Sequence, residues 1–385
     1  MRIDLDANAT TPVLPEVLEA MQPYWLELYG NPSSTHQSGR RARGAVEMAR
    51  IALASLLHCS AKEIVFTSGG TESDNLALCG VLQPYLDRGE PAHLITTQIE
   101  HHAVLFAAES LERRGVEVTY LKPDSNGVIR PEDLEAALRP HTRLVSVMLA
   151  NNETGAIQPV GKIARIAKAH GALVHTDAVQ GAAKIPLDLS GEFKNVDLLS
   201  LSGHKMYAPQ GTGVLFVRQG ISIAPLFHGG PHERQRRAGT ENVPGIVGLG
   251  RAAELGQQRL AAGHITTLTT LRDRLEQGLL SAIPGATINC ATAPRVPNTT
   301  SLRIDSINAE ALIIALDLQG IAASFGSACM SGAAEPSHVL IAMGLSSAEA
   351  LATIRLSLST LTTAEEIDRA LEIIPAAVTR LRSVV

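Results

Sequence analysis

The sequence has few aromatic residues and no long run of charge or of apolar residues. Aromatic residues make up 3% of the 385 residues, so the core must rest on Ala, Leu, Ile and Val. The net charge is −5, and there is no long basic run, which argues against nucleic acid as the main partner. Without an apolar run of about 18 residues, no membrane span is expected. The start, MRIDLDANATTP, is acidic where a secretory signal would be basic and then apolar, so we expect a cytoplasmic protein.

Cysteine is also scarce, with only Cys59, Cys79, Cys290 and Cys329 in the chain. None forms a C-x-x-C pair, and a disulfide framework is not expected in so long a cytosolic chain. Cys329 stands out because it lies among the small residues of SFGSACMSGAAEPSHVL, 324–340. Small residues of this kind neither pack a core nor sustain a helix, so the stretch predicts an accessible, mobile thiol. For a cysteine taken alone, a small buried thiol is the more common explanation.

Between about 60 and 220, short apolar runs alternate with helical patterns. The predicted strands are 63–67, 93–97, 116–121, 143–149, 172–177, 196–202 and 213–217, and the predicted helices are 73–82, 103–114, 131–138 and 161–170. Strands that are nearly all apolar and separated by helices predict a mostly parallel sheet covered on both faces, which is an α/β fold. Ligands of such sheets bind at the carboxyl ends of the strands.

The pattern changes after about residue 260. Long amphipathic helices at 265–282 and 364–382 flank short strands at 300–304 and 354–358, which predicts a smaller α+β domain. The opening segment 1–15 does not fit the regular alternation, and we assign it to this second domain. The prediction is a large domain over 16–258 and a small domain over 1–15 and 259–385, with a mobile cysteine loop at about 325–336.

The stretch TSGGTESDN, 67–75, follows the first predicted strand and opens a helix. Gly69 and Gly70 let backbone N–H groups approach an anion, and a helix N-terminus attracts negative charge. The G-x-x-x-x-G-K-[ST] pattern of a P-loop is absent. The stretch therefore favours either phosphate binding or an ordinary capped turn.

Two charged residues are predicted at the same edge of the sheet. Asp177 ends an apolar strand, where a carboxylate can pair with a protonated ring nitrogen or serve as a helix cap or surface acid. Lys205 follows the strand 196–202, among small and apolar neighbours and one histidine. A partly buried lysine loses its proton readily, which suits a Schiff base, although a lysine at a strand end is more often solvated.

Arg355 lies inside the predicted strand 354–358, between Ile354 and Leu356. An arginine on an apolar strand needs an anionic partner, and its fork suits either a bound carboxylate or a structural ion pair. A phosphate cradle, an acid, a lysine and an arginine for a carboxylate together match one cofactor, pyridoxal 5'-phosphate, acting on an amino acid.

Motifs along the whole chain resemble the cysteine desulfurases of the NifS/IscS type, class V members of the fold-type I pyridoxal-phosphate enzymes. The stretches that carry the resemblance include DANATTPVLPEV (6–17), EIVFTSGGTESDNLAL (63–78), NNETGAIQPV (151–160), HTDAVQGAAKIPLD (175–188), LSGHK (201–205), GGPHERQRRAGTENV (229–243), GSACMSGAAEPSHVL (326–340) and TIRLSLS (353–359). The resemblance implies the fold of a PLP-dependent transferase. Phe325 departs from the family pattern, since relatives have a small residue there.

The resemblance also implies a role for each matching residue. Lys205 would bind the cofactor as an imine, Cys329 would accept the sulfur, and His101 would stack on the ring and move protons. The remaining implied contacts are Gly70, Thr71, Ser202, His204 and Thr240 of the partner subunit at the phosphate, Asp177 at the ring nitrogen, Asn152 and Gln180 at the ring substituents with Gln180 at the phenolic oxygen, and Arg355 with Asn31 at the substrate carboxylate. No metal is implied.

The implied activity is the removal of sulfur from L-cysteine by a homodimer. The products would be L-alanine and a persulfide on Cys329, which would pass to an acceptor such as an iron–sulfur scaffold protein. The alternatives are a selenocysteine lyase or another class V enzyme, and a non-catalytic sulfur-assembly component. A zinc or iron site built on Glu100, His101, His102, His175 and Asp177 is a further alternative, but adjacent histidines lack the spacing of H-E-x-x-H.

Overall fold

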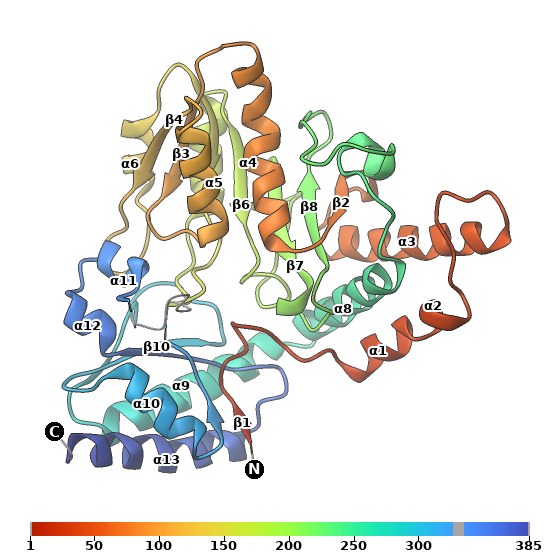
Figure 1. The fold of residues 1–385 in the computed structure, drawn as a ribbon. Coiled ribbons are helices and arrows are strands. Elements are labelled where there is room, and N and C mark those ends of the chain that lie inside the picture. Colours follow the sequence, from red (N-terminus) through yellow and green to blue (C-terminus); the bar gives the residue numbers. More distant parts are fainter. Residues whose placement is uncertain (1, 326–334, 384–385) are drawn as a thin grey trace.

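The computed structural model describes residues 2–325 and 335–383. Figure 1 shows a larger lobe built around a sheet and a smaller lobe below it, where both ends of the chain lie. None of the helices in the described part of the chain combines the length and apolarity needed to cross a membrane.

The larger lobe is built on one seven-stranded sheet. Its strands are β2 (Ile64–Thr67), β3 (His93–Thr97), β4 (Glu117–Leu121), β5 (Thr142–Ser146), β6 (Leu173–Asp177), β7 (Leu198–Ser202) and β8 (Gly213–Val217), in the order β2-β8-β7-β6-β5-β3-β4. The pairs β3–β4, β3–β5, β5–β6 and β6–β7 are parallel. Only β8 runs antiparallel to its neighbours β2 and β7. The prediction of a mostly parallel sheet is confirmed.

Helices cover both faces of this sheet because alternate strand residues point in opposite directions. In β2, Val65 belongs to the apolar core shared with α4 (Gly70–Asp87) and α5 (His102–Glu112). Its neighbours Ile64 and Phe66 belong to the core on the other face. That second core also includes residues of α1 (Pro15–Met21), α3 (Gln37–Leu56), α6 (Pro131–Ala137), α7 (Val160–Ala169) and α8 (Val243–Ala261).

The helices α3 and α8 were not predicted. Four glycines in α8 weaken the helical signal of its sequence, since glycine is a poor helix former. One of them has a packing role: a Cβ on Gly250 would lie 2.6 Å from the Cα of Ala49 in α3. The glycine lets the two helix backbones approach closely, and this long-range contact offsets the weak local propensity.

The smaller lobe has its own apolar core. The elements of this lobe are α9 (His264–Ala282), β9 (Ala286–Ile288), β10 (Thr299–Ile304), α10 (Ala309–Asp317), β11 (Ile321–Ala322), α11 (His338–Ala342), α12 (Ser347–Leu351), β12 (Thr353–Ser357) and α13 (Ala364–Arg382). β12, β10 and β9 form an antiparallel sheet. β1 (Ile3–Asp4) pairs in parallel with β11, and Ile3 and Leu5 enter the core of this lobe. The domain limits at 15 and 258 stay a prediction, and α8 continues past the second of them.

Candidate active site

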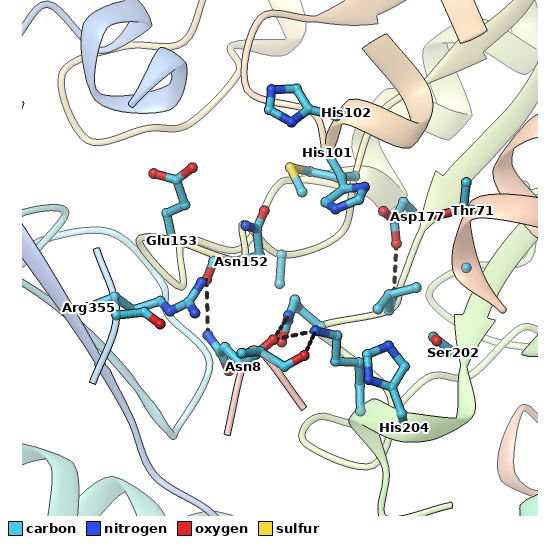
Figure 2. Close-up of a pocket in the computed structure, with 18 of the residues that line it drawn as sticks. Asn8, Thr71, His101, His102, Asn152, Glu153, Asp177, Ser202, His204 and Arg355 are labelled. Atoms are coloured by element: carbon cyan, nitrogen blue, oxygen red, sulfur yellow. Dashed lines mark hydrogen bonds between the residues drawn. The ribbon is translucent and has the colours of Figure 1, made fainter. Parts of the chain in front are cut away.

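A cavity of about 500 Å³ lies at the carboxyl edge of the large sheet and is also lined by residues of the smaller lobe. Most of the predicted site residues line it, namely Gly70, Thr71, His101, Asn152, Asp177, Gln180, Ser202, His204, Lys205 and Arg355. Figure 2 shows Arg355 and Glu153 on one side of the cavity and Asp177 and Thr71 on the other. The volume is in the range of cavities that hold small ligands.

Lys205 ends a single 3₁₀ turn, Gly203–Lys205, that follows β7 directly. Its Nζ donates hydrogen bonds to the carbonyl oxygens of Asn8 (2.5 Å) and Ala9 (2.6 Å). Burial, followed by the charge of Arg355, lowers the pKa of Lys205 to about 8, while Asp6 and Asp177 act in the opposite direction. An ordinary lysine is almost entirely protonated near neutral pH, so this amine is unusually available as a nucleophile.

Asp177 is the last residue of β6 and is 5% exposed. One carboxylate oxygen accepts a hydrogen bond from the N–H of Val179 at 2.9 Å. Burial raises the pKa of Asp177 to about 6, against the opposing effects of the Val179 N–H and of Lys205. A second acid, Asp74, is 1% exposed and also lines the cavity. Burial, followed by the charge of Asp177, raises the pKa of Asp74 well above its usual range. A cationic ring nitrogen beside Asp177 would stabilise its carboxylate.

The N-terminus of α4 forms an anion-sized cradle. The helix begins at Gly70, and Gly69 precedes it with φ 155° and no side-chain cap. A Cβ on Gly70 would lie 2.9 Å from Cγ2 of Val179, so only glycine leaves this approach open. Ser202 and His204 line the same cavity. Free N–H groups at a helix start, together with hydroxyl and imidazole groups, are suitable donors for a phosphate.

His204 and His101 are both held in the neutral form. Desolvation and then Lys205 lower the pKa of His204 to about 4, and its Nδ1 lies 3.1 Å from Oγ1 of Thr10. Desolvation lowers the pKa of His101 to about 4, with smaller effects from His102, Lys205 and His338. The Nδ1 of His101 accepts the N–H of Ala103 (3.1 Å) at the start of α5. A ring that accepts at Nδ1 carries its proton on Nε2.

Arg355 lies in β12 and is buried, with 7% of its surface exposed. The sequence left open whether it forms a structural ion pair or binds a carboxylate ligand, and its surroundings are compatible with both. Its Nη2 pairs with Asp6 (2.8 Å), and its Nη1 donates to the carbonyl oxygen of Asn152 (3.1 Å). Its Nε is buried without a hydrogen-bond partner among the described residues. Because Arg355 also lines the cavity, its guanidinium can meet an anionic ligand beside its structural ion pair.

Asn8, which was not predicted, connects the two sides of the cavity. It is 2% exposed. Its Nδ2 donates to the carbonyl of Asn152 (3.1 Å) and to Oγ1 of Thr299 (2.8 Å). Its Oδ1 accepts from Asn298 (3.1 Å) and Lys184 (3.2 Å), and its carbonyl accepts from Lys205. The opening segment thus orients residues from both lobes.

Two further residues at the side of the cavity next to the smaller lobe were not among the predicted site residues. Glu153 is buried, accepts a hydrogen bond from the Ser337 hydroxyl and lines the cavity. Burial raises the pKa of Glu153, while Ser337 and Arg355 oppose that shift. Phe325, noted in the sequence as a departure, also lines the cavity.

Two of the predicted residues that the structure describes do not line this cavity. Asn31 and Thr240 are exposed and lie outside it. Thr240 was predicted to act in the partner subunit's site, so its role and that of Asn31 stay predictions. Cys329 lies outside the described residues.

The residues of the alternative metal site have other partners. His175 is buried between the hydroxyls of Ser146 and Ser200, and desolvation lowers its pKa to about 3. Glu100 accepts from the Thr97 hydroxyl and the Met148 N–H, and burial raises its pKa to about 8. Within residues 2–325 and 335–383, no group of three or more His, Cys, Asp or Glu residues is arranged to hold a metal ion.

Comparisons with known proteins agree with this arrangement. The family model described as Aminotransferase class-V matches residues 3–370. A cysteine desulfurase of Nostoc sp. (strain PCC 7120 / SAG 25.82 / UTEX 2576) is 49% identical over 381 residues, which cover 99% of this chain and 94% of the relative. The solved structure of a NifS-like protein is 41% identical, covers 99% of this chain and 100% of its own, and has a TM-score of 0.91. The structure of SspA in complex with cysteine is 36% identical, with coverages of 94% and 100% and a TM-score of 0.81.

The similarity extends over nearly the whole length in both sequence and structure, and the cavity gathers the groups that the motifs predicted. The chain therefore belongs to the class V aminotransferase family and, within it, to the cysteine desulfurases.

Proposed function

We propose that this protein removes sulfur from L-cysteine with pyridoxal 5'-phosphate bound at Lys205. The observation that carries the proposal is the convergence of Lys205, Asp177, the α4 N-terminus and Arg355 on one cavity. The families to which the chain belongs are PLP enzymes, and SspA, a solved relative, is in complex with cysteine.

The residues present fit the cofactor. The close approach of Gly70 to Val179 leaves room where a side chain would block the cradle. The start of α4, with Thr71, Ser202 and His204, would hold the phosphate, together with Thr240 of the partner subunit in a homodimer. Asp177 would face the ring nitrogen, and Asn152 and Gln180 the ring substituents. The bound cofactor would supply an electron sink that weakens bonds around the substrate α-carbon.

Side chains of this chain would bind the substrate and move its protons. Arg355, which lines the cavity, would bind the substrate carboxylate with its guanidinium and hold the amino acid at the smaller-lobe side, with Asn31 as a second proposed contact. Lys205, with its lowered pKa, would take and return protons as a general base. His101, neutral with its proton on Nε2, would stack on the ring and assist proton movement.

Cys329 would accept the sulfur. Its thiolate would form an S–S bond to the sulfur of L-cysteine while the carbon–sulfur bond breaks and its electron pair goes to carbon. Protonation of that carbon gives L-alanine, so the sum is L-cysteine plus a thiol giving L-alanine plus a persulfide. The persulfide sulfur would pass to an acceptor, for which an iron–sulfur scaffold protein is the candidate.

Mass spectrometry after incubation with L-cysteine tests this proposal. One added sulfur on the Cys329 peptide, together with stoichiometric alanine, is the expected result. The variant Cys329→Ser should retain the visible absorption band of the cofactor and lose alanine formation. Alanine formed at the normal rate by Cys329→Ser would contradict the acceptor role and favour a selenocysteine lyase or another class V activity.

A further inference from the structure

Lys184 is a second lysine at the active site, and none of the roles described so far uses it. It lies four residues after Gln180, in the turns that follow β6, and is not among the residues that line the cavity. Its Nζ donates to Oε1 of Gln180 (2.6 Å) and to Oδ1 of Asn8 (3.2 Å). Among the ion pairs of the described residues, none includes Lys184. Lys184 is partly buried, and a lysine that packs its nitrogen against two amides without a carboxylate loses hydration without gaining an ion pair.

The surroundings of Lys184 are cationic. Burial, followed by the charges of Lys205 and Arg355, lowers the pKa of Lys184 to about 7. The nearby acids are engaged elsewhere, because Asp6 pairs with Arg355 and Asp177 accepts the N–H of Val179. Although the pKa of Lys184 is lower than that of Lys205, its nitrogen is occupied by Gln180 and Asn8, whereas Lys205 lines the cavity.

The contacts of Lys184 determine the orientation of the Gln180 amide. Its Oε1 accepts from Lys184, and its Nε2 donates to the carbonyl oxygen of Asn8 at 3.1 Å. While Lys184 is protonated, its ammonium can only donate, and the Asn8 carbonyl can only accept. A flipped Gln180 amide would then place its Nε2 against the ammonium and its Oε1 against the carbonyl oxygen, and both contacts are unfavourable. Gln180 is 4% exposed and lines the cavity. Its oxygen is thus occupied by Lys184, and its second Nε2–H is left for a ligand.

We propose that Lys184 is a positioning residue that holds Gln180 as a hydrogen-bond donor to the phenolic oxygen of the cofactor. The inference rests on the proposed function, in which Gln180 meets that oxygen. A donor there stabilises the phenolate and makes the conjugated lysine nitrogen less basic. Without Lys184, only the Asn8 carbonyl would orient the Gln180 amide, and its donation to the phenolic oxygen would weaken.

The charge of Lys184 acts in the same direction, because a nearby cation also disfavours a protonated nitrogen. The two contributions are separable in a double-mutant cycle. If Lys184 acts only through Gln180, its removal has no further effect once Gln180 is gone. If it acts through charge alone, its removal has the same effect in either background.

The experiment is a pH titration of the visible absorption band of the cofactor-loaded protein. Lys184→Met should raise the midpoint by about one pH unit, a tenfold change in proton affinity. Gln180→Leu should raise it similarly, and Lys184→Met should shift the midpoint less in the Gln180→Leu background than in the wild-type background. An unchanged midpoint in Lys184→Met, or equal Lys184→Met shifts in both backgrounds, would overturn the inference.

Lys184→Gln supplies an independent test should Lys184→Met fail to fold. Its amide keeps a donor for Oε1 of Gln180 without a charge, so its midpoint should lie closer to wild type than to that of Gln180→Leu. A midpoint as high as that of Gln180→Leu would contradict the positioning role. If the visible cofactor band survives in the Lys205→Ala variant, the proposed function itself is contradicted. The two failures are therefore distinguishable.

Discussion

The two ends of the cavity are built in different ways. At the cofactor end, Asp177 and Ser202 are the last residues of neighbouring strands, and Lys205 follows in the next turn. At the substrate end, Arg355 depends on Asp6, 349 residues away, and on Asn152, 203 residues away. The first end is a local product of sheet topology, and the second exists only once distant segments have assembled.

This difference predicts different consequences of mutation. Substitutions at the cofactor end should change the room and the charge beside a rigid edge of the sheet. They should therefore affect cofactor binding. Changes at the substrate end should disturb contacts between lobes, and should affect substrate binding or folding. Asn8 contacts both ends and should show both kinds of effect.

The largest effect is expected for Arg355→Gln. The substitution removes the charged fork that would bind the substrate carboxylate and leaves Asp6 without its partner. We expect kcat/KM for L-cysteine to fall by about a hundredfold or more, mainly through KM. Steady-state kinetics measure this, with the visible cofactor band as a control for loading. A lost cofactor band with an unchanged KM would place Arg355 at the cofactor end and break the comparison.

A smaller effect is expected for Gly70→Ala at the cofactor end. The new methyl group would lie 2.9 Å from Cγ2 of Val179, and overpacking of this size should weaken cofactor binding about tenfold. The dissociation constant for pyridoxal 5'-phosphate is the readout, and Gly70→Ala with Val179→Ala should recover part of the loss. Gly44→Ala is a matched control, because nothing lies within 4 Å of its Cβ. Equal losses in both glycine variants would contradict the cradle.

Asn8→Ala should lower the stability of the protein. Its side-chain amide makes hydrogen bonds to residues of both lobes, and the substitution removes one hydrogen bond from Lys184 and one from Asn298. We expect the free energy of unfolding to fall by about 2 kcal/mol, seen as a lower urea midpoint. Asn195→Ala is the control, since no side-chain hydrogen bond of Asn195 is present among the described residues. A midpoint equal to that of the control would show that Asn8 does not join the two ends.

The smallest effect is a pH dependence at the cofactor end. The amine of Lys205 must be neutral to attack the cofactor aldehyde, and its pKa is lowered to about 8. The rate of cofactor uptake by the apoprotein should therefore rise with pH, reach half its maximum near pH 8 and level off above. Stopped-flow absorbance measures it. A midpoint near 10.5, the usual value for a lysine, would mean that the amine is not buried as described.

The same contrast explains how much the sequence predicted. Asp177, Lys205 and the Gly69–Gly70 turn could be predicted because each follows an apolar strand, and strand ends in a parallel sheet share an edge. Asn8 and Lys184 gave no such signal. Asn8 belongs to an irregular opening segment, and the partner of Lys184 at Asn8 lies 176 residues away. The helix α8 was missed for a related reason, because its glycines are explained only by the approach of α3.

The family resemblance supplied what local patterns could not. Taken alone, Arg355 was compatible with an ion pair or with ligand binding, and in the structure it pairs with Asp6 and also lines the cavity. Sequence patterns record which residues are apolar and where strands end, but they do not record which distant groups meet.

The central claim is that Lys205, rather than the neighbouring Lys184, binds the cofactor. Borohydride reduction of the loaded protein fixes the cofactor to its lysine, and mass spectrometry of the digested protein identifies the site. The account predicts a pyridoxyl group on Lys205 alone, because Lys205 lines the cavity while the nitrogen of Lys184 is held by Gln180 and Asn8. A pyridoxyl group on Lys184, or on neither lysine, would contradict it.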